Sequence, residues 1–272
     1  MNDFRGRGTT KAYLSESFLR SPDARALRIL AEYMEPESRL AHYQIDDTIV
    51  FMGSARFIAR DQAQAEVKAA EAGKGNLEEA KLRLEMSQYY EAARELAHRL
   101  TLWSKSLSEE ERRFVVCTGG GPGIMEAANR GASEARGANV GLSISIPIEQ
   151  TDNPYITREL AFQFHYFFMR KFWFAYLAKA VIFFPGGFGT FDELFEVLTL
   201  VQTKKVRKHM PLVLFGTDYW KDVVNFKALV RYGTISPEDL DLFRITDSVD
   251  EAFEHVVSEL TKHMESERGA TL

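Results

Sequence analysis

Residues 181–193 read VIFFPGGFGTFDE, and this stretch constrains the fold more than any other. Four apolar residues run into a proline and two glycines, after which apolar residues recur at helical spacing. We therefore expect a buried strand, a tight glycine turn and the start of a helix. Free N–H groups at a helix N-terminus carry partial positive charge, and glycines let an anion approach them closely. The stretch predicts an anion site, with the carboxylate of Glu193 at the start of the helix.

A second interpretation of the same residues needs no ligand. Thr190 and Glu193 have the spacing of a capping box, in which each side chain accepts a hydrogen bond from the other residue's backbone N–H. A capping box does not require glycines in front of it, so the glycine pattern favours the anion site.

Strand-like and helix-like segments alternate along the chain. The expected strands are residues 48–52, 114–118, 139–146, 180–184 and 211–215. The expected helices are residues 77–103, 123–136, 166–177, 190–203 and 219–229, with a closing helix at 252–260. Continuously apolar strands that alternate with helices indicate an α/β fold with a doubly wound, Rossmann-like parallel sheet. Ligands of such sheets bind at the carboxyl ends of the strands.

The expected domain organisation is a single Rossmann-like domain over residues 48–272, preceded by a helical extension over residues 1–47. In the extension, Ser21 and Pro22 predict the start of a helix, and Pro36 predicts a position beyond its end. Residues 61–76 are rich in Ala, Glu and Lys and predict a solvated helical insertion.

The composition of the chain bears on whether it binds nucleic acid or a membrane. The formal net charge of −5 argues against a nucleic-acid binder, whose affinity depends on clustered cations. Cys117 is the single cysteine, and no uncharged run is long enough to span a membrane. We therefore expect a cytoplasmic protein with neither nucleic acid nor a membrane as a partner.

A second glycine-rich turn follows the expected strand 114–118. Its glycines include Gly120 and Gly121, but their register matches neither the P-loop nor the dinucleotide fingerprint. The turn predicts a phosphate- or sugar-sized site, and a purely structural turn is the alternative. The six histidines are scattered along the chain without paired carboxylates or cysteines, so we expect no metal and no cofactor.

Arg170 and Lys171 lie inside an expected helix that is apolar around most of its circumference. A buried guanidinium is costly unless it meets an acceptor, and Glu193 or a bound phosphate could supply one. In the alternative interpretation, both cations extend to water from a helix end. His165, just before this helix, is expected to pack or form hydrogen bonds.

Three segments together resemble the Lonely Guy family. They are Met169-Arg170-Lys171, the PGGFGTFDE turn, and the upstream sequence GGGPGIME, and the resemblance covers about residues 48–230. Many members of this family carry the label lysine decarboxylase. The resemblance implies a homodimer or higher homo-oligomer whose domain 48–272 binds and cleaves a nucleoside 5′-monophosphate. The substrate would be AMP or a cytokinin riboside monophosphate, and the products the base and ribose 5-phosphate.

The resemblance also assigns roles to residues. Glu193 and Arg170 match the family's catalytic pair, and the glycine turn matches its phosphate site. The substrate-binding residues implied are Gly53, Ser54, Gly120, Gly121, Glu149, Lys171, Gly186, Gly187, Gly189, Thr190 and Thr199. This chain has Phe168 where a histidine usually stands in the family. A carrier of the same fold, which binds a nucleotide or the molybdenum cofactor without catalysis, is the alternative function.

Overall fold

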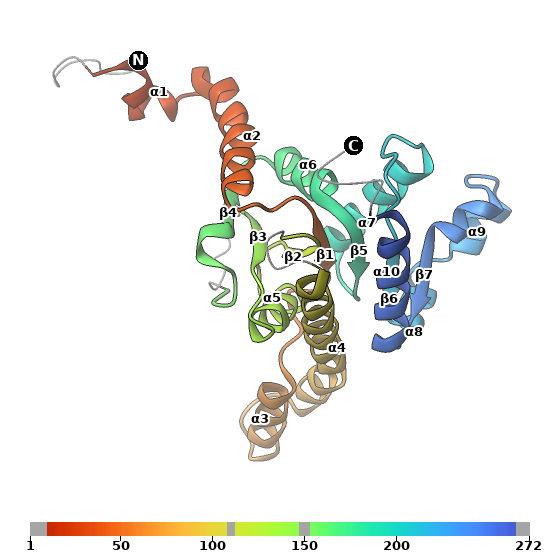
Figure 1. Ribbon diagram of the computed structural model, residues 1–272. Coiled ribbons are helices and arrows are strands. Elements are labelled where there is room, and N and C mark those ends of the chain that lie inside the picture. The colour runs from red at the N-terminus through yellow and green to blue at the C-terminus, as the bar shows by residue number, and fades with distance from the viewer. Residues whose placement is uncertain (1–9, 108–111, 147–152, 265–272) are drawn as a thin grey trace.

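The protein is described by a computed structural model over residues 10–107, 112–146 and 153–264. Its centre is a sheet of seven parallel strands in the order β4-β3-β2-β1-β5-β6-β7 (Figure 1). The strands are β1 (Thr48–Met52), β2 (Val115–Thr118), β3 (Asn139–Ile144), β4 (Ala161–Phe164), β5 (Ala178–Phe183), β6 (Leu212–Phe215) and β7 (Phe243–Thr246). The predicted doubly wound, Rossmann-like α/β fold is confirmed.

Five of these strands were expected from the sequence, and the two edge strands were not. The interior strands β1, β2, β5 and β6 are buried at every residue, which is why they read as continuous apolar runs. The edge strand β4 alternates exposed and buried residues over only four positions. So short an alternation gives a weak signal in the sequence.

Helices cover both faces of the sheet. They are α1 (Glu16–Leu19), α2 (Arg25–His42), α3 (Arg60–Glu71), α4 (Leu77–Leu107), α5 (Ile124–Glu134), α6 (Phe167–Leu177), α7 (Phe188–Gln202), α8 (Thr217–Val223), α9 (Phe226–Arg231) and α10 (Val249–His263). Short 3-10 turns occupy Ala12–Leu14, Pro22–Ala24, Arg158–Leu160 and Pro237–Leu242. One apolar core lies between the sheet and α6, α7, α8 and α9. The other lies between the sheet and α4, α5 and α10.

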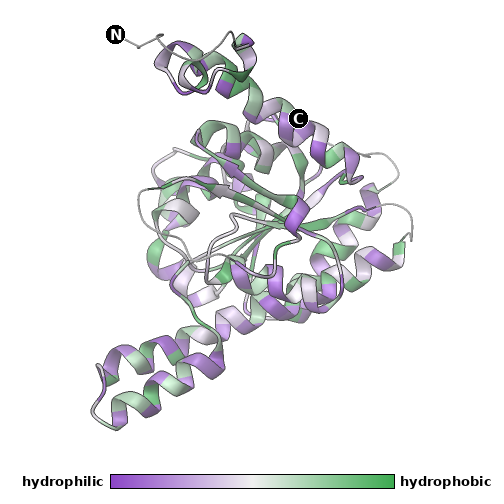
Figure 2. Cartoon of the chain, turned by 90° about the vertical axis from the view of Figure 1, so that its left-hand side faces the viewer, coloured by the Kyte–Doolittle hydropathy of each residue, from purple (hydrophilic) through white to green (hydrophobic). Residues whose placement is uncertain are grey.

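The insertion before the second strand is a helical hairpin. Helix α3 packs against the first part of α4. Figure 2 shows the two extending away from the body, while the apolar strands gather at its centre. The predicted solvated insertion therefore forms one arm of a projecting hairpin. In the described part of the chain, each helix is too short or too polar to cross a membrane.

The prediction that the N-terminal helix ends before Pro36 is wrong. Helix α2 runs through Pro36 to His42, and Pro36 is buried inside it. Proline has no N–H, so the carbonyl of Glu32 loses its normal helical partner. The indole N–H of Trp173 on α6 donates to that carbonyl at 3.0 Å, which replaces the missing hydrogen bond.

The helix expected at residues 219–229 is in fact two helices. Helix α8 ends at Val223, and α9 begins at Phe226 after Asn225, whose side chain accepts a hydrogen bond from the Ala228 N–H. Asparagine at this position is a strong N-cap, and it starts a new helix rather than continuing the old one.

The strand order reverses direction at β1. On one side of β1 the strands follow in the order β2, β3, β4. On the other side they follow in the order β5, β6, β7. In doubly wound sheets the crevice at such a reversal, beyond the carboxyl ends of the strands, is where ligands bind. The fold therefore places a site between the ends of β1 and β5.

Candidate functional site

Three loops meet beyond the ends of β1 and β5. The N–H of Ser54 donates to the carbonyl of Pro185 at 2.9 Å, which ties the end of β1 to the glycine turn after β5. The carbonyl of Ser54 accepts from the N–H of Ile124 at 3.0 Å, where α5 begins. These backbone hydrogen bonds fix the two glycine-rich turns and the start of α5 around one point.

A pocket of about 300 Å³ opens at this point. Its walls come from the end of β1, from α5, α6 and α7, and from the turns that join them. The lining residues are Met52, Gly53, Ser54, Ala55, Arg56, Gly119, Met125, Arg170, Phe174, Gly187, Gly189, Thr190 and Glu193. Seven of the residues predicted for the site are among them: Gly53, Ser54, Arg170, Gly187, Gly189, Thr190 and Glu193.

Helix α7 begins earlier than the sequence suggested. Its N-cap is Gly187, no side chain caps it, and the N–H groups of Thr190 and Phe191 both donate to the Gly187 carbonyl. Thr190 is therefore inside the first turn, and the alternative capping box is wrong. The N–H groups of Phe188 and Gly189 precede the first helical hydrogen bond, so they are available to an anion.

The glycines of this turn leave space for a ligand. A Cβ atom added at Gly187 or Gly189 would meet nothing within 4 Å, so side chains are absent where the turn faces the pocket. Gly186 differs, because its Cβ would lie 2.1 Å from Oγ1 of Thr190. The hydroxyl of Tyr219 donates a short hydrogen bond to the Gly186 carbonyl and holds the turn from behind.

Arg170 and Glu193 face each other across one wall of the pocket. Arg170 Nη2 lies 3.9 Å from Glu193 Oε1, and their side chains are only 15% and 7% exposed. The guanidinium also lies over the ring of Phe167, at 5.1 Å from its centroid. Among the described residues, neither Arg170 Nε nor Glu193 Oε1 has a hydrogen-bond partner. Buried polar atoms are nearly always satisfied, so these two indicate a place for a ligand.

Burial governs the protonation of Glu193. Desolvation raises the pKa of its carboxyl to about 7, although the positive charges of Lys171 and Arg170 oppose the rise. Burial likewise lowers the pKa of the Arg170 guanidinium, against the attraction of Glu193. A carboxyl that titrates near neutrality, beside a cation and a pocket, can donate or accept a proton under ordinary conditions.

Other predicted residues lie around the pocket without lining it. Lys171 Nζ is held by Asp192 at 2.8 Å and Glu196 at 2.7 Å, both on α7. Thr199 lies further along α7, where its hydroxyl donates to the Phe195 carbonyl. Glu149 is outside the described residues.

The second glycine turn contributes through Gly119. Gly120 and Gly121 are buried and do not line the pocket. Gly120 has φ of +70°, and its N–H donates to Thr118 Oγ1 at 2.9 Å. That hydroxyl in turn donates to Asn129 on α5, so this part of the turn is fixed by the protein itself.

Six further residues that line the pocket were not predicted for the site: Met52, Ala55, Arg56, Gly119, Met125 and Phe174. Arg56 follows the end of β1 and is an exposed cation, with its N–H bonded to Ser54 Oγ at 3.1 Å. The signal was its position two residues after Ser54, in the same turn. Phe168, the departure from the family pattern, is 54% exposed and lies outside the pocket wall.

Comparisons with known proteins give distant structural relatives. No curated protein matches the chain. The structure of TM1055, a structural-genomics target, is 21% identical, with a TM-score of 0.48 over 78% of this chain and 99% of that one. A molybdenum cofactor binding protein from Rippkaea orientalis is 17% identical, with a TM-score of 0.48 over 78% of this chain and 96% of that one.

A third solved structure, the molybdenum cofactor carrier protein from Chlamydomonas reinhardtii, has 19% identity and a TM-score of 0.48. The alignment covers 79% of this chain and 99% of that one. Such low identities and TM-scores assign no activity. The family model described as "Possible lysine decarboxylase" matches residues 125–256, which contain Arg170, Glu193 and the glycine turn between β5 and α7. This match supports the resemblance to the Lonely Guy family, many of whose members carry that label.

Proposed function

We propose that this protein hydrolyses the N-glycosidic bond of a nucleoside 5′-monophosphate and releases the free base and ribose 5-phosphate. The observation that carries the proposal is the buried pair Arg170 and Glu193, each with a polar atom that no described residue satisfies, beside an open helix N-terminus. A phosphate at that N-terminus would set the ribose against the pair.

The chemical step takes place at Glu193 and Arg170, and the phosphate binds at the start of α7. Cleavage of a ribosyl C–N bond passes through an oxocarbenium-like state, which a nearby carboxylate stabilises. Glu193 in its ionised form would stabilise that charge and take a proton from the attacking water. The water oxygen bonds to C1′ and loses a proton to Glu193, while the electron pair of the C–N bond leaves with the base. The base takes up a proton from solvent, and Glu193 returns its proton to solvent after the products leave. Arg170 would hold the Glu193 carboxylate in place or contact the phosphate.

Binding of the phosphate supplies orientation rather than chemistry. The N–H groups of Phe188 and Gly189 and the dipole of α7 favour an anion, and the space beside Gly187 and Gly189 admits it. Interactions made far from the reacting carbon raise the rate because they hold C1′ close to Glu193.

The test is base release from a panel of nucleoside monophosphates, followed by chromatography of the base and of ribose 5-phosphate. We expect turnover with at least one member of the panel and its loss in Glu193→Gln. Glu254→Gln, which alters an exposed carboxylate on α10, is the control and should keep full activity. A non-catalytic carrier of a nucleotide or of the molybdenum cofactor would bind its ligand without releasing any base, and that outcome would replace the proposal.

A further inference from the structure

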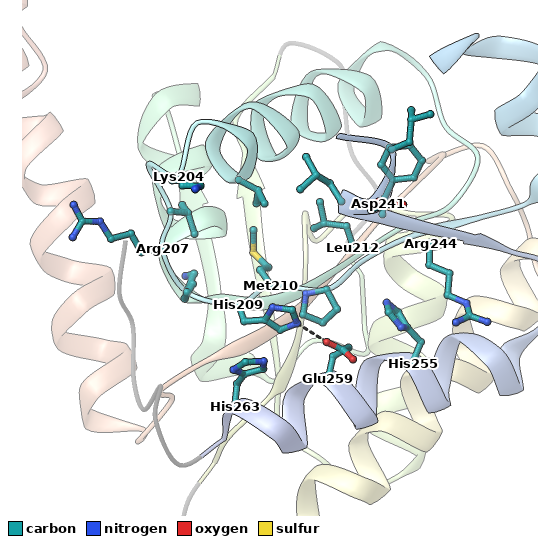
Figure 3. Close-up of a pocket in the computed structure, with 17 residues that line it drawn as sticks. Lys204, Arg207, His209, Met210, Leu212, Asp241, Arg244, His255, Glu259 and His263 are labelled. Atoms are coloured by element: carbon teal, nitrogen blue, oxygen red, sulfur yellow. Dashed lines mark ion pairs between the residues drawn. The ribbon is translucent and has the colours of Figure 1, made fainter. Parts of the chain in front are cut away.

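A larger pocket, of about 840 Å³, lies at the other end of the strands. Its walls come from the segment between α7 and β6, from the start of β7, and from one face of α10 (Figure 3). None of its lining residues belongs to the pocket at the ends of β1 and β5. The nucleotide chemistry proposed above makes no use of it.

Three metal-ligand side chains converge in this pocket. His209 comes from the segment before β6, and Glu259 and His263 lie one helical turn apart near the end of α10. One ligand atom from each lies within 4.8 Å of the other two. His209 Nε2 is 2.7 Å from Glu259 Oε2, and the rings of His209 and His263 stack with centroids 4.2 Å apart. Figure 3 shows His209 pointing across the pocket toward α10.

We propose that His209, Glu259 and His263 bind one divalent transition-metal ion of the zinc class, with a further coordination position open to the pocket. Two imidazoles and one carboxylate form a donor set that zinc takes in proteins, with water or a ligand in the fourth position. Imidazole nitrogen selects such ions over Mg²⁺ and Ca²⁺, which prefer oxygen ligands.

The distances fit after a small adjustment. Ligand atoms about 2.1 Å from a tetrahedral ion are about 3.4 Å apart. His209 Nε2 and Glu259 Oε2, now 2.7 Å apart, must therefore separate slightly, and a pair near the 4.8 Å limit of the cluster must close. The stacked imidazoles must also turn, because an ion lies in the plane of each ring that binds it. Rotation of a histidine ring about χ2 has broad, shallow minima, and the open pocket leaves room for it.

The pocket carries charges of both signs, because its lining contains Asp241 and Glu259 beside four cations, Lys204, Arg207, Lys208 and Arg244. The Glu259 carboxylate supplies the negative charge among the three side chains, and His209 Nε2 lies 2.7 Å from its Oε2. Lys262 Nζ binds Glu259 Oε1 at 2.6 Å, so an ion bound to Oε2 would take the place of the contact between Oε2 and His209 Nε2. Arg244 also lines the pocket but lies 3.9 Å from Glu251, away from the three ligands.

The site would connect two distant parts of the chain. An ion at this point would cross-link the segment between α7 and β6 to the C-terminal end of α10. A ligand that binds the folded state but not the unfolded state stabilises the folded state. The metal should therefore raise the temperature of unfolding.

The test is equilibrium dialysis of the chelator-treated full chain against zinc chloride, with magnesium chloride as a second arm, and thermal unfolding of the same samples. We expect one zinc per chain, no magnesium at the same concentration, and a Tm that rises with zinc. His263→Gln and Glu259→Gln should each weaken zinc binding at least tenfold. His255→Gln removes an imidazole one turn earlier on α10, on a wall of the same pocket, and should leave binding unchanged.

The Tm of each variant is measured without metal and compared with that of the metal-free wild type. A variant with an unchanged Tm is folded, so its loss of zinc binding is not caused by unfolding. Absence of stoichiometric zinc binding in the wild-type protein would overturn the proposal. So would zinc binding that His263→Gln and Glu259→Gln leave intact, or that His255→Gln weakens equally.

Discussion

The indole N–H of Trp173 donates at 3.0 Å to the carbonyl of Glu32, the acceptor that Pro36 leaves without a helical partner. The carboxylate of Glu32 in turn accepts from the N–H groups of His165 and Tyr166, just before α6 begins. One residue of the N-terminal helix thus fixes both a side chain and the N-terminal end of α6. Since α6 carries Arg170, the N-terminal extension positions a residue of the candidate site.

The first prediction tests this hydrogen bond with a double-mutant cycle. Trp173→Phe should lower the free energy of unfolding, in part because it leaves the part-buried Glu32 carbonyl without a protein donor, at a cost of about 1 kcal/mol. Pro36→Ala restores a backbone N–H to that carbonyl. In the Pro36→Ala background the cost of Trp173→Phe should therefore be smaller, as measured by urea unfolding. Equal costs in the two backgrounds would show that the indole N–H is not replacing the helical donor.

The second prediction concerns Glu193. Glu193→Gln keeps the size of the side chain but removes its negative charge, so kcat should fall by orders of magnitude with little change in KM. Steady-state kinetics on the best substrate measure both constants. Near-normal kcat would show that the carboxylate does not act on the transition state.

The third prediction concerns Arg170. Arg170→Met should reduce kcat/KM by about 10²–10³-fold, the typical effect of removing one charge-stabilising donor. The variant should stay folded, because Glu193 can take up a proton once its cation is gone. Arg231→Met, which changes an exposed arginine at the end of α9, serves as the control. General unfolding of Arg170→Met, seen by circular dichroism, would instead assign the residue a structural role.

The interior strands of the sheet can be predicted from the sequence, but the edge strands cannot. Strands β1 and β5 are buried at every position and mostly apolar, because helices cover both faces of the sheet. The strand β7 is four residues long and only partly buried, so nothing in the sequence distinguishes it from a loop. The continuation of α2 through Pro36 depends on Trp173, which lies far away in the sequence.

The site was predictable where its residues are neighbours in the sequence. The glycine turn and Glu193 lie in one segment, and the apolar surroundings of Arg170 predicted an anionic partner for it. The helix start was misplaced because Gly187, and not Thr190, is the N-cap. Glu259 and His263 have the i, i+4 spacing of two ligands on one helix face, but His209 joins them only through the fold.

The fourth prediction is a pH dependence of stability. The pKa of Glu193 is about 7 in the folded protein and 4.5 in its unperturbed state, so the folded protein holds the proton more tightly. Between these values the unfolded state binds fewer protons, and the free energy of unfolding falls as pH rises. Over the whole window the loss is about 3 kcal/mol. Urea unfolding of wild type and Glu193→Gln should give curves that diverge from pH 4.5 to 7, with only the wild type losing stability from this group.

Activity should also follow the titration of Glu193, but it should rise with pH where the stability falls. Because the ionised carboxylate is the proposed reactive form, kcat/KM should fall below an apparent pKa of about 7. A profile without this acid limb, together with unchanged stability across the window, would contradict the assignment of a raised pKa to Glu193.

The last prediction is that the 5′-phosphate is required. The start of α7 offers the N–H groups of Phe188 and Gly189 and the helix dipole to an anion, and the glycines leave the approach open. Hydrogen bonds to a charged group contribute about 1.5–3 kcal/mol each, so the loss of two should lower kcat/KM by several orders of magnitude. The protein should therefore cleave AMP or a related monophosphate and leave the matching nucleoside almost untouched.

Two further measurements separate this phosphate requirement from a general preference for charged ligands. Ribose 5-phosphate should inhibit competitively, since it carries the same phosphate and sugar, whereas ribose should not. Gly189→Val places a branched side chain in the open space of the turn and should raise KM for the monophosphate. Similar kcat/KM for adenosine and AMP would mean that the turn at residues 185–190 only joins β5 to α7.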